Sequence, residues 1–206
     1  MKLRAISSGI HATLLFAAMT GAAHAHHAMD YALPATPFEG LLSGLGHPVI
    51  GLDHLLFIIG AGVAAARFDR GAALPLVFVV ASVLAAGLRY LGPAVPAGEM
   101  LVAGSLVVLG ALMLLARGPG RGILAVVFLA AGAVHGNALA EAIVGAERAP
   151  LAAYLAGLAV IQCVIALAAW GAARRLSAHR PNLPLQRLAG AVVGIAGLAF
   201  AGMAAL

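Results

Sequence analysis

The amino-acid sequence predicts an all-α membrane protein, a polytopic bundle of about six transmembrane helices that follows a cleaved signal peptide. Three observations carry this prediction. Of the 206 residues, 63% are hydrophobic and 9% are charged, a balance far from that of soluble globular domains. The apolar residues gather in segments of about 20 residues, the length that crosses the hydrocarbon core of a bilayer. Arginines are concentrated in alternate connections between these segments.

The first 25 residues have the pattern of a secretory signal peptide. Lys2 and Arg4 precede an apolar stretch, and small residues then lead to an A-x-A cleavage pattern at residues 23–25. The alternative is an uncleaved first transmembrane helix, although His11 interrupts the apolar stretch. A signal peptide delivers the following residues to the outside of the membrane.

Residues 26–46 are predicted to be a histidine-containing extracytoplasmic segment. Cleavage after Ala25 leaves two histidines at the mature N-terminus. Cleavage after Ala23 leaves one histidine first and another third, an arrangement that chelates nickel or copper. Metal capture is therefore one interpretation, and a polar spacer is the other, because histidine-rich tracts indicate metal binding only by composition. The candidate capturing residues are His24, His26 and His27.

A six-helix transmembrane domain is predicted over residues 47–206. Glycine, proline and charged residues separate its apolar segments. The second half of residues 30–46, just before the domain, is expected to form a short interfacial or re-entrant helix. The predicted spans are residues 48–66, 72–91, 98–116, 122–144, 151–173 and 186–205.

The arginines predict the orientation of these spans. With the mature N-terminus outside, the three inner connections hold eight arginines and the outer side holds two, which is the positive-inside pattern. Both mature termini are therefore expected on the periplasmic side of the inner membrane, in agreement with the signal peptide. The inner arginines are Arg67, Arg70, Arg117, Arg121, Arg174, Arg175, Arg180 and Arg187, and the outer ones are Arg89 and Arg148.

Several other features are best explained by structure. Cys163 is the single cysteine, so no intramolecular disulfide can form. The pI near 10.4 comes from arginines at segment ends rather than from a basic patch with interleaved aromatic residues, so nucleic acid is not an expected partner. Glycines at small-xxx-small spacing predict close helix packing, as in Gly40/Gly44, Gly132/Gly136 and Gly190/Gly194.

The stretch from Gly46 to His54 places two imidazoles and a carboxylate at the head of the first span. Ionisable groups are costly in a membrane and usually mark an ion path, a proton relay or a metal site. Pro48 suits a first helical position, so His47 is expected just outside a helix that carries Asp53 and His54. On one continuous helix the two histidines would lie about 10 Å apart, too far to bind one ion. Either the backbone is irregular here or another helix supplies ligands; a polar, hydrogen-bonded knot is the structural alternative.

A second polar cluster, His135 to Glu141, lies on the fourth span. These two residues are separated by a rise of about 9 Å on a regular helix, so they also need a partner segment. In the predicted topology His54, His135 and Glu141 share the outer half of the membrane, which favours one composite site over simple interhelical hydrogen bonding. Secondary candidates are Asn137, Glu147 and Gln162, the last better explained by packing, whereas Asp69, Glu99 and Arg148 are interpreted as loop charges.

Together the motifs resemble those of the HupE/UreJ family of secondary nickel and cobalt permeases. The first is His-Pro-x-x-Gly-x-Asp-His at 47–54, and the second is His-Gly-x-Ala-x-x-Glu at 135–141, followed by Gly-Ala-Glu at 145–147. The resemblance implies a link to hydrogenase or urease maturation. Ala140 and Leu139 depart from the family pattern, and the latter removes a histidine that some relatives have. The implied metal-handling positions are His47, Asp53, His54, His135 and Glu141.

The ligand chemistry bounds the function. Imidazole and carboxylate ligands suit nickel, cobalt, zinc or manganese, and they disfavour copper(I) or an iron–sulfur cluster. The predicted function is a permease without catalytic residues that takes up Ni²⁺ or Co²⁺, with Zn²⁺ as a further candidate, in contact with the lipid bilayer; self-association into a homo-oligomer is left open. Two alternatives are an intramembrane zinc hydrolase, with Asp53 or Glu141 as the base, and a metal-binding accessory that does not transport.

Overall fold

The computed structural model describes residues 33–206. The predicted signal peptide and the candidate capturing residues His24, His26 and His27 lie outside the described residues. The described chain is built of helices, as the apolar segments predict. They are α2 (Pro37–Ile50), α3 (Leu52–Ala65), α4 (Leu74–Leu91), α5 (Gly98–Leu114), α6 (Arg121–Leu139), α7 (Arg148–His179) and α8 (Leu185–Ala204), with 3₁₀ turns η2 (Gly71–Ala73) and η3 (Ala140–Ala142).

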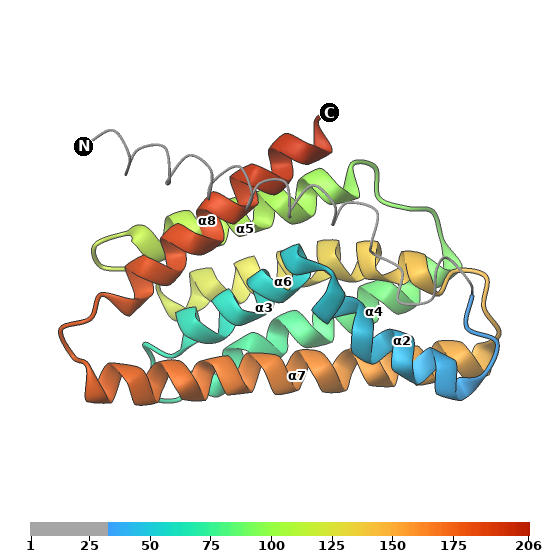
Figure 1. Ribbon diagram of the computed structural model, residues 1–206, viewed down its shortest axis with the longest axis horizontal. Helices are drawn as coiled ribbons and strands as arrows, with labels where there is room; N and C mark the ends of the chain where they lie inside the picture. Colours follow the sequence, from blue (N-terminus) through green and yellow to red (C-terminus); the bar gives the residue numbers. More distant parts are fainter. Residues whose placement is uncertain (1–32) are drawn as a thin grey trace, which may run out of the picture.

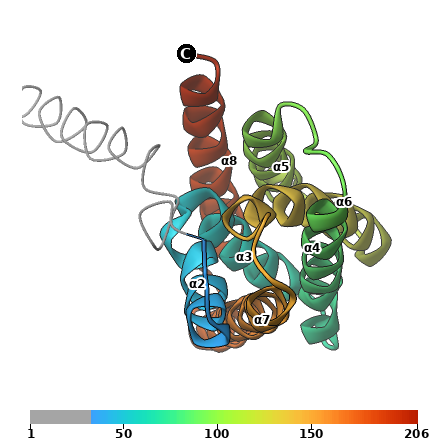
Figure 2. The same ribbon diagram turned by 90° about the vertical axis from the view of Figure 1, so that its right-hand side faces the viewer.

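The helices pack as three pairs around a central helix. α5 packs against α8, α4 against α6, and α2 against α7, while α3 lies in the middle and contacts members of all three pairs (Figures 1 and 2). Helices that follow one another from α3 to α8 are joined by short connections and run back and forth along the long axis of Figure 1. Each end of the bundle therefore brings together residues that are far apart in the sequence.

Several of these helices can span a membrane. Four helical segments are long and apolar enough to do so, and α2 with α3, bent by 77° at their junction, can count as a fifth span. α5 is apolar but has 17 residues, about 26 Å in length. The all-α membrane class is therefore confirmed, whereas the count of six spans remains a prediction. α7, with 32 residues, extends over about 48 Å and exceeds the hydrocarbon thickness of about 30 Å.

The expected start of the first span is wrong. Instead of one helix over residues 48–66, the chain forms two short helices that meet at Gly51, whose φ of −72° and ψ of 96° are extended. His47 and Pro48 therefore lie inside the last turn of α2, not before a helix. The helix predicted in the second half of residues 30–46 is present as the beginning of α2, where Thr36 and Glu39 form a capping box. The irregular backbone proposed near Gly51 is thus present.

The fourth span also ends earlier than predicted. α6 stops at Leu139 and continues only as η3, so Glu141 lies on a 3₁₀ turn rather than on the helix that carries His135. The Tyr154 hydroxyl donates to the Leu139 carbonyl, which satisfies one of the acceptors left at the helix end. Gly145, at a φ of +96°, then turns the chain toward α7.

Glycine contacts hold the helix pairs together, as the small-xxx-small spacing predicts. A Cβ on Gly40 would overlap the Pro150 carbonyl, and one on Gly44 would overlap the Tyr154 carbonyl, so α2 lies directly on the backbone of α7. Gly136 is in similar contact with Ser82, and Gly190 with Gly110. These backbone contacts fix the positions of the paired helices along the bundle axis. They thereby also fix how far along the bundle the polar side chains of these helices lie.

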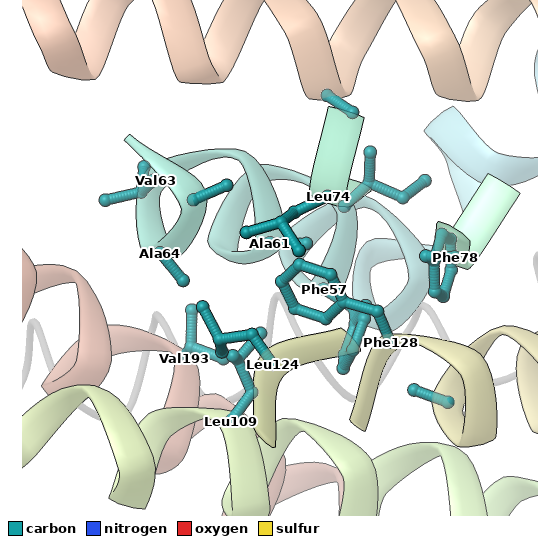
Figure 3. Packing of buried hydrophobic residues seen from close by; sticks show 14 of the residues in the cluster. Phe57, Ala61, Val63, Ala64, Leu74, Phe78, Leu109, Leu124, Phe128 and Val193 are labelled. Atoms are coloured by element: carbon teal, nitrogen blue, oxygen red, sulfur yellow. The ribbon is translucent and has the colours of Figure 1, made fainter. Parts of the chain in front are cut away.

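An apolar core fills the space between the two ends of the bundle. Phe57 of α3 stacks on Phe78 of α4 with ring centroids 4.9 Å apart and meets Phe128 of α6 edge to face at 6.3 Å. Figure 3 shows these rings together with Leu74, Leu109 and Leu124. All of these side chains are buried, so this region of the bundle is hydrophobic and closely packed.

One end of the bundle, here called the arginine-rich end, comprises the connections 66–73, 115–120 and 180–184 and the adjoining helix termini (Figure 1). Arg67 donates to the carbonyl of Pro119 and to that of Arg117, Arg121 donates to the Arg70 carbonyl, and Arg174 donates to the Phe68 carbonyl. These bonds tie the connections to one another. The polar motifs of the sequence lie away from this end.

Candidate metal site

A small cavity lies where α3, α5 and α6 approach the α2–α3 junction. Its volume is about 60 Å³, enough for a few water molecules. Unlike most of the interior, its walls are largely ionisable. The lining residues are His47, Asp53, His54, Glu99, Val102, Ala138 and Glu141.

The break at Gly51 brings the residues of the first motif to this cavity. A Cβ at this position would lie 2.8 Å from the His54 ring and 3.3 Å from Asp53 Oδ1, so glycine is required for the close approach. Beyond the break, Asp53 lies in the first turn of α3, where the helix dipole favours a negative charge, and its Oδ1 accepts from the His54 backbone N–H at 2.8 Å. The His47 ring lies 6.4 Å from the His54 ring, centroid to centroid.

A chain of hydrogen bonds assigns the tautomer of each central histidine. Ser105 Oγ is 2.7 Å from the Val102 carbonyl, to which its single proton is donated. It can therefore only accept at its 2.8 Å contact with His135 Nε2, which places the proton of neutral His135 on Nε2. The Nδ1 of His135 is then an acceptor, and His54 Nδ1, 2.8 Å away, is the donor. The acceptor nitrogen of neutral His54 is consequently Nε2.

This assignment sets the metal-binding geometry of His54. Its Nε2 lies 4.0 Å from Asp53 Oδ1. Two ligands that each bind a transition metal at about 2.1 Å can be at most about 4.2 Å apart, so both atoms can reach one ion with a small rotation of either side chain. His135 differs from His54 in these respects. Both of its ring nitrogens are hydrogen-bonded, and the residue is fully buried and does not line the cavity.

Aromatic rings surround His135 on its other sides. The Phe57 ring centroid is 4.8 Å from that of His135, and the Phe78 centroid is 5.3 Å away. Both phenylalanines belong to the apolar core of Figure 3. A hydrophobic barrier thus separates the cavity from the arginine-rich end of the bundle.

Glu99 lines the cavity, although the sequence suggests only a loop charge there. It lies in the first turn of α5, two residues after Ala97, which caps that helix at a positive φ of 57°. The connection before it is fastened to α6, because the Val95 backbone N–H donates to Asn137 Oδ1 at 3.0 Å. Asn137 is therefore an anchor for this connection and not a cavity residue. The sequence does hold one signal for Glu99: it is an acidic residue at the same end of the predicted bundle as both motifs.

The remaining candidates lie in different positions. Glu141 lines the cavity from η3. Glu147 is exposed and occupies the N-cap of α7, outside the cavity wall. Gln162 is fully buried and its Nε2 donates to Ser82 Oγ at 3.1 Å, which agrees with the packing interpretation.

The candidate ligands surround the cavity but do not converge on a single point. Within residues 33–206, no group of three or more His, Cys, Asp or Glu side chains is close enough to hold a metal ion as it stands. His47, Asp53, His54, Glu99 and Glu141 nevertheless line the same small cavity. The arrangement can attract a cation and offers it nitrogen and oxygen ligands.

Comparison with known proteins identifies a family. A family model described as HupE / UreJ protein matches residues 13–200, nearly the whole chain. No curated protein and no solved structure matches. The matched residues include both polar motifs and all helices from α2 to α7.

Proposed function

Because the chain belongs to the HupE/UreJ family of permease-like membrane proteins linked to nickel and cobalt, we propose that it takes up a divalent transition metal ion, nickel or cobalt, through the cavity at the α2–α3 junction. The ion is the substrate. The arginine-rich end faces the cytoplasm of the inner membrane in this proposal, and the cavity opens toward the periplasm. Family membership also suggests a role in supplying a metal-dependent enzyme.

The observation that carries the proposal is the chemistry of the cavity wall. Three carboxylates, from Asp53, Glu99 and Glu141, and the imidazoles of His47 and His54 come from four separate elements to one small space. Carboxylates gathered around one small cavity create a negative potential there, which attracts cations. Nitrogen and oxygen ligands of this kind suit nickel, cobalt or zinc.

We further propose distinct roles for the two central histidines. His54 binds the ion through Nε2, together with Asp53. His135 accepts a hydrogen bond from His54 Nδ1–H and so holds the His54 ring in the tautomer and orientation that binding needs. This refines the sequence-based expectation that both histidines are ligands.

In this proposal the apolar core is a barrier that must open before the ion can cross. An ion in the cavity faces His135 and the rings of Phe57 and Phe78 on its way to the arginine-rich end. The membrane potential, inside negative, favours entry of a divalent cation by about 4.6 kcal/mol per 100 mV, twice the value for one charge. Release into the cytoplasm therefore requires rearrangement of these side chains, and the membrane potential can supply a driving force for the ion.

Transport is tested by uptake of radioactive nickel and cobalt into proteoliposomes, with zinc as a competitor. We expect saturable uptake by the wild-type protein, and uptake near background for Glu141→Ala, because a carboxylate ligand is lost. His179→Ala is the control, since this exposed histidine is at the arginine-rich end, hydrogen-bonded to the Arg175 carbonyl. Binding without movement of metal by the wild-type protein would contradict the permease and favour a non-transporting accessory. Turnover of lipid or peptide would favour a hydrolase.

Glu99→Gln gives a smaller effect. The substitution keeps the shape of the side chain but removes one of the three cavity charges, so we expect the KM for nickel to rise about tenfold with a modest change in maximal rate. Glu147→Gln, an exposed acid outside the cavity wall, is the matched control and should leave the KM unchanged. Equal KM values for the two variants would show that Glu99 has no part in capture.

A further inference from the structure

A pair of adjoining cavities at the arginine-rich end is not explained by metal uptake. One has a volume of about 320 Å³ and the other about 410 Å³, and they share Arg67, Ser177 and Gln186. We refer to them together as the basic chamber. They lie between the end of α3, the α5–α6 connection and the junction of α7 with α8, far from the metal site.

The charge of the chamber is uncompensated. Arg67, Arg117 and Arg187 line the first cavity, and Arg174 is added in the second. Among the described residues of the chamber, Asp69 is the one acid; it lies 3.7 Å from Arg174 and its side chain points into solvent. Four arginines against one carboxylate leave a formal charge of +3 in this space.

The guanidinium groups differ in what they already bind. Arg67 is engaged with backbone carbonyls of the α5–α6 connection, and so it is a fixed part of the wall. Within the described residues, Arg117 and Arg187 have no hydrogen-bond or ion-pair partner for their side chains. Arg187 lies in the first turn of α8, where a cation is unfavourable beside the positive end of the helix dipole unless an anion is present.

The chamber has an apolar side as well. Ala64, Met113, Leu115 and Leu185 line the first cavity beside the arginines. Leu115, at the end of α5, is exposed. A ligand that suits both kinds of wall carries an anionic group joined to hydrocarbon, and basic pockets between transmembrane helices on the cytoplasmic side bind such headgroups.

We propose that the basic chamber binds the phosphate of an anionic phospholipid, with Arg117 and Arg187 as its main contacts. Arginine matches a phosphate with two parallel N–H donors, which favours this assignment over a diffuse attraction. The lipid would tie together the three connections at this end of the bundle. The proposal does not depend on metal transport, because binding can be measured without it.

The test uses the full-length protein in detergent, titrated with phosphatidylglycerol or with phosphatidylcholine of the same acyl chains, and binding is measured by native mass spectrometry. We expect a clear preference for phosphatidylglycerol. The double variant Arg117→Gln/Arg187→Gln should bind it about 30-fold more weakly, because each of the two arginines near a lipid surface contributes roughly 1 kcal/mol. Its helical circular dichroism should match that of the wild type.

The control removes the same charge elsewhere at the same end. Arg70 and Arg175 lie outside both cavity walls. The double variant Arg70→Gln/Arg175→Gln should therefore bind phosphatidylglycerol within about twofold of the wild type. An equal loss in both double variants would overturn the proposal in favour of a diffuse basic field. Inorganic phosphate or glycerol 3-phosphate serves as a soluble competitor; displacement of the lipid at low millimolar concentration would instead indicate a site for a free phosphate compound.

Discussion

His54→Ala is expected to reduce nickel and cobalt uptake to background while the protein remains folded. The substitution removes Nε2, the nitrogen that the hydrogen-bond chain from Val102 through Ser105 and His135 leaves as the acceptor. It also removes the partner that lies 4.0 Å from Asp53 Oδ1. A lone carboxylate in the cavity wall would still attract cations but would have no nitrogen ligand beside it. The measurement is uptake by proteoliposomes together with metal binding in detergent.

The same chain predicts a different result for His135. His135→Ala leaves His54 Nε2 in place but frees the ring to turn, so we expect metal affinity to fall about 10- to 100-fold, as for other residues that orient a ligand. Uptake should then recover at high metal concentration, which it should not do for His54→Ala. Identical behaviour of the two variants at every concentration would contradict the assignment of separate roles and return His135 to the ligands.

Ser105 explains why the roles could not be separated from the sequence. Its hydroxyl donates to Val102 one turn earlier on α5, and this local bond decides the proton position on a histidine of α6, 30 residues away. The sequence places His54 and His135 at the same end of antiparallel segments, and in the structure the two rings are joined by a hydrogen bond. That they form one metal site stays a prediction. Which of them presents a nitrogen to the cavity depends on side chains that no motif contains.

The sequence predicts some of the helix ends correctly and others not. α4 and α5 begin or end within a few residues of the predicted spans, because Gly and Pro breakers and apolar length are local properties. Pro48 misled the prediction: proline is favoured in a first turn, but here it lies in the last turn of α2. The chain tolerates this because only Val49 and Ile50 follow Pro48 before Gly51 ends α2, and because α2 is held on α7 by Gly40 and Gly44.

Glu99 was missed for a tertiary reason. An acid after Pro93 and Pro96 looks like any residue of an exposed connection. Its place in the cavity wall depends on the bond between the Val95 N–H and Asn137, 42 residues apart in the sequence. The sequence makes Asn137 a secondary candidate ligand, because on a regular helix it shares a face with Glu141, but α6 ends before Glu141 and that face is not continued.

Gly136→Val is expected to prevent folding, the largest stability effect that the structure predicts. A Cβ on this glycine would overlap the backbone carbonyl of Ser82, and one turn earlier a Cβ on Gly132 would lie 2.5 Å from the Phe78 carbonyl oxygen, so α6 lies directly on the backbone of α4. Because the obstacle is backbone rather than a flexible side chain, the α4–α6 pair must separate. Overpacking of a close-packed interior usually costs about 1–3 kcal/mol, and a β-branched side chain against backbone exceeds that range.

Gly104→Val supplies the matched control, since a Cβ on this α5 glycine has no atom within 4 Å to meet. It should express and unfold like the wild type in detergent melts, whereas Gly136→Val should be lost to aggregation and Gly136→Ala should melt earlier. His135 precedes Gly136 directly, so separation of α4 from α6 would also draw its ring away from His54. Gly136→Ala should therefore lose metal affinity together with stability. A stable Gly136→Val protein with normal metal affinity would contradict this prediction. It would show that the α4–α6 contact sets neither the position of His135 along the bundle axis nor the geometry of the metal site.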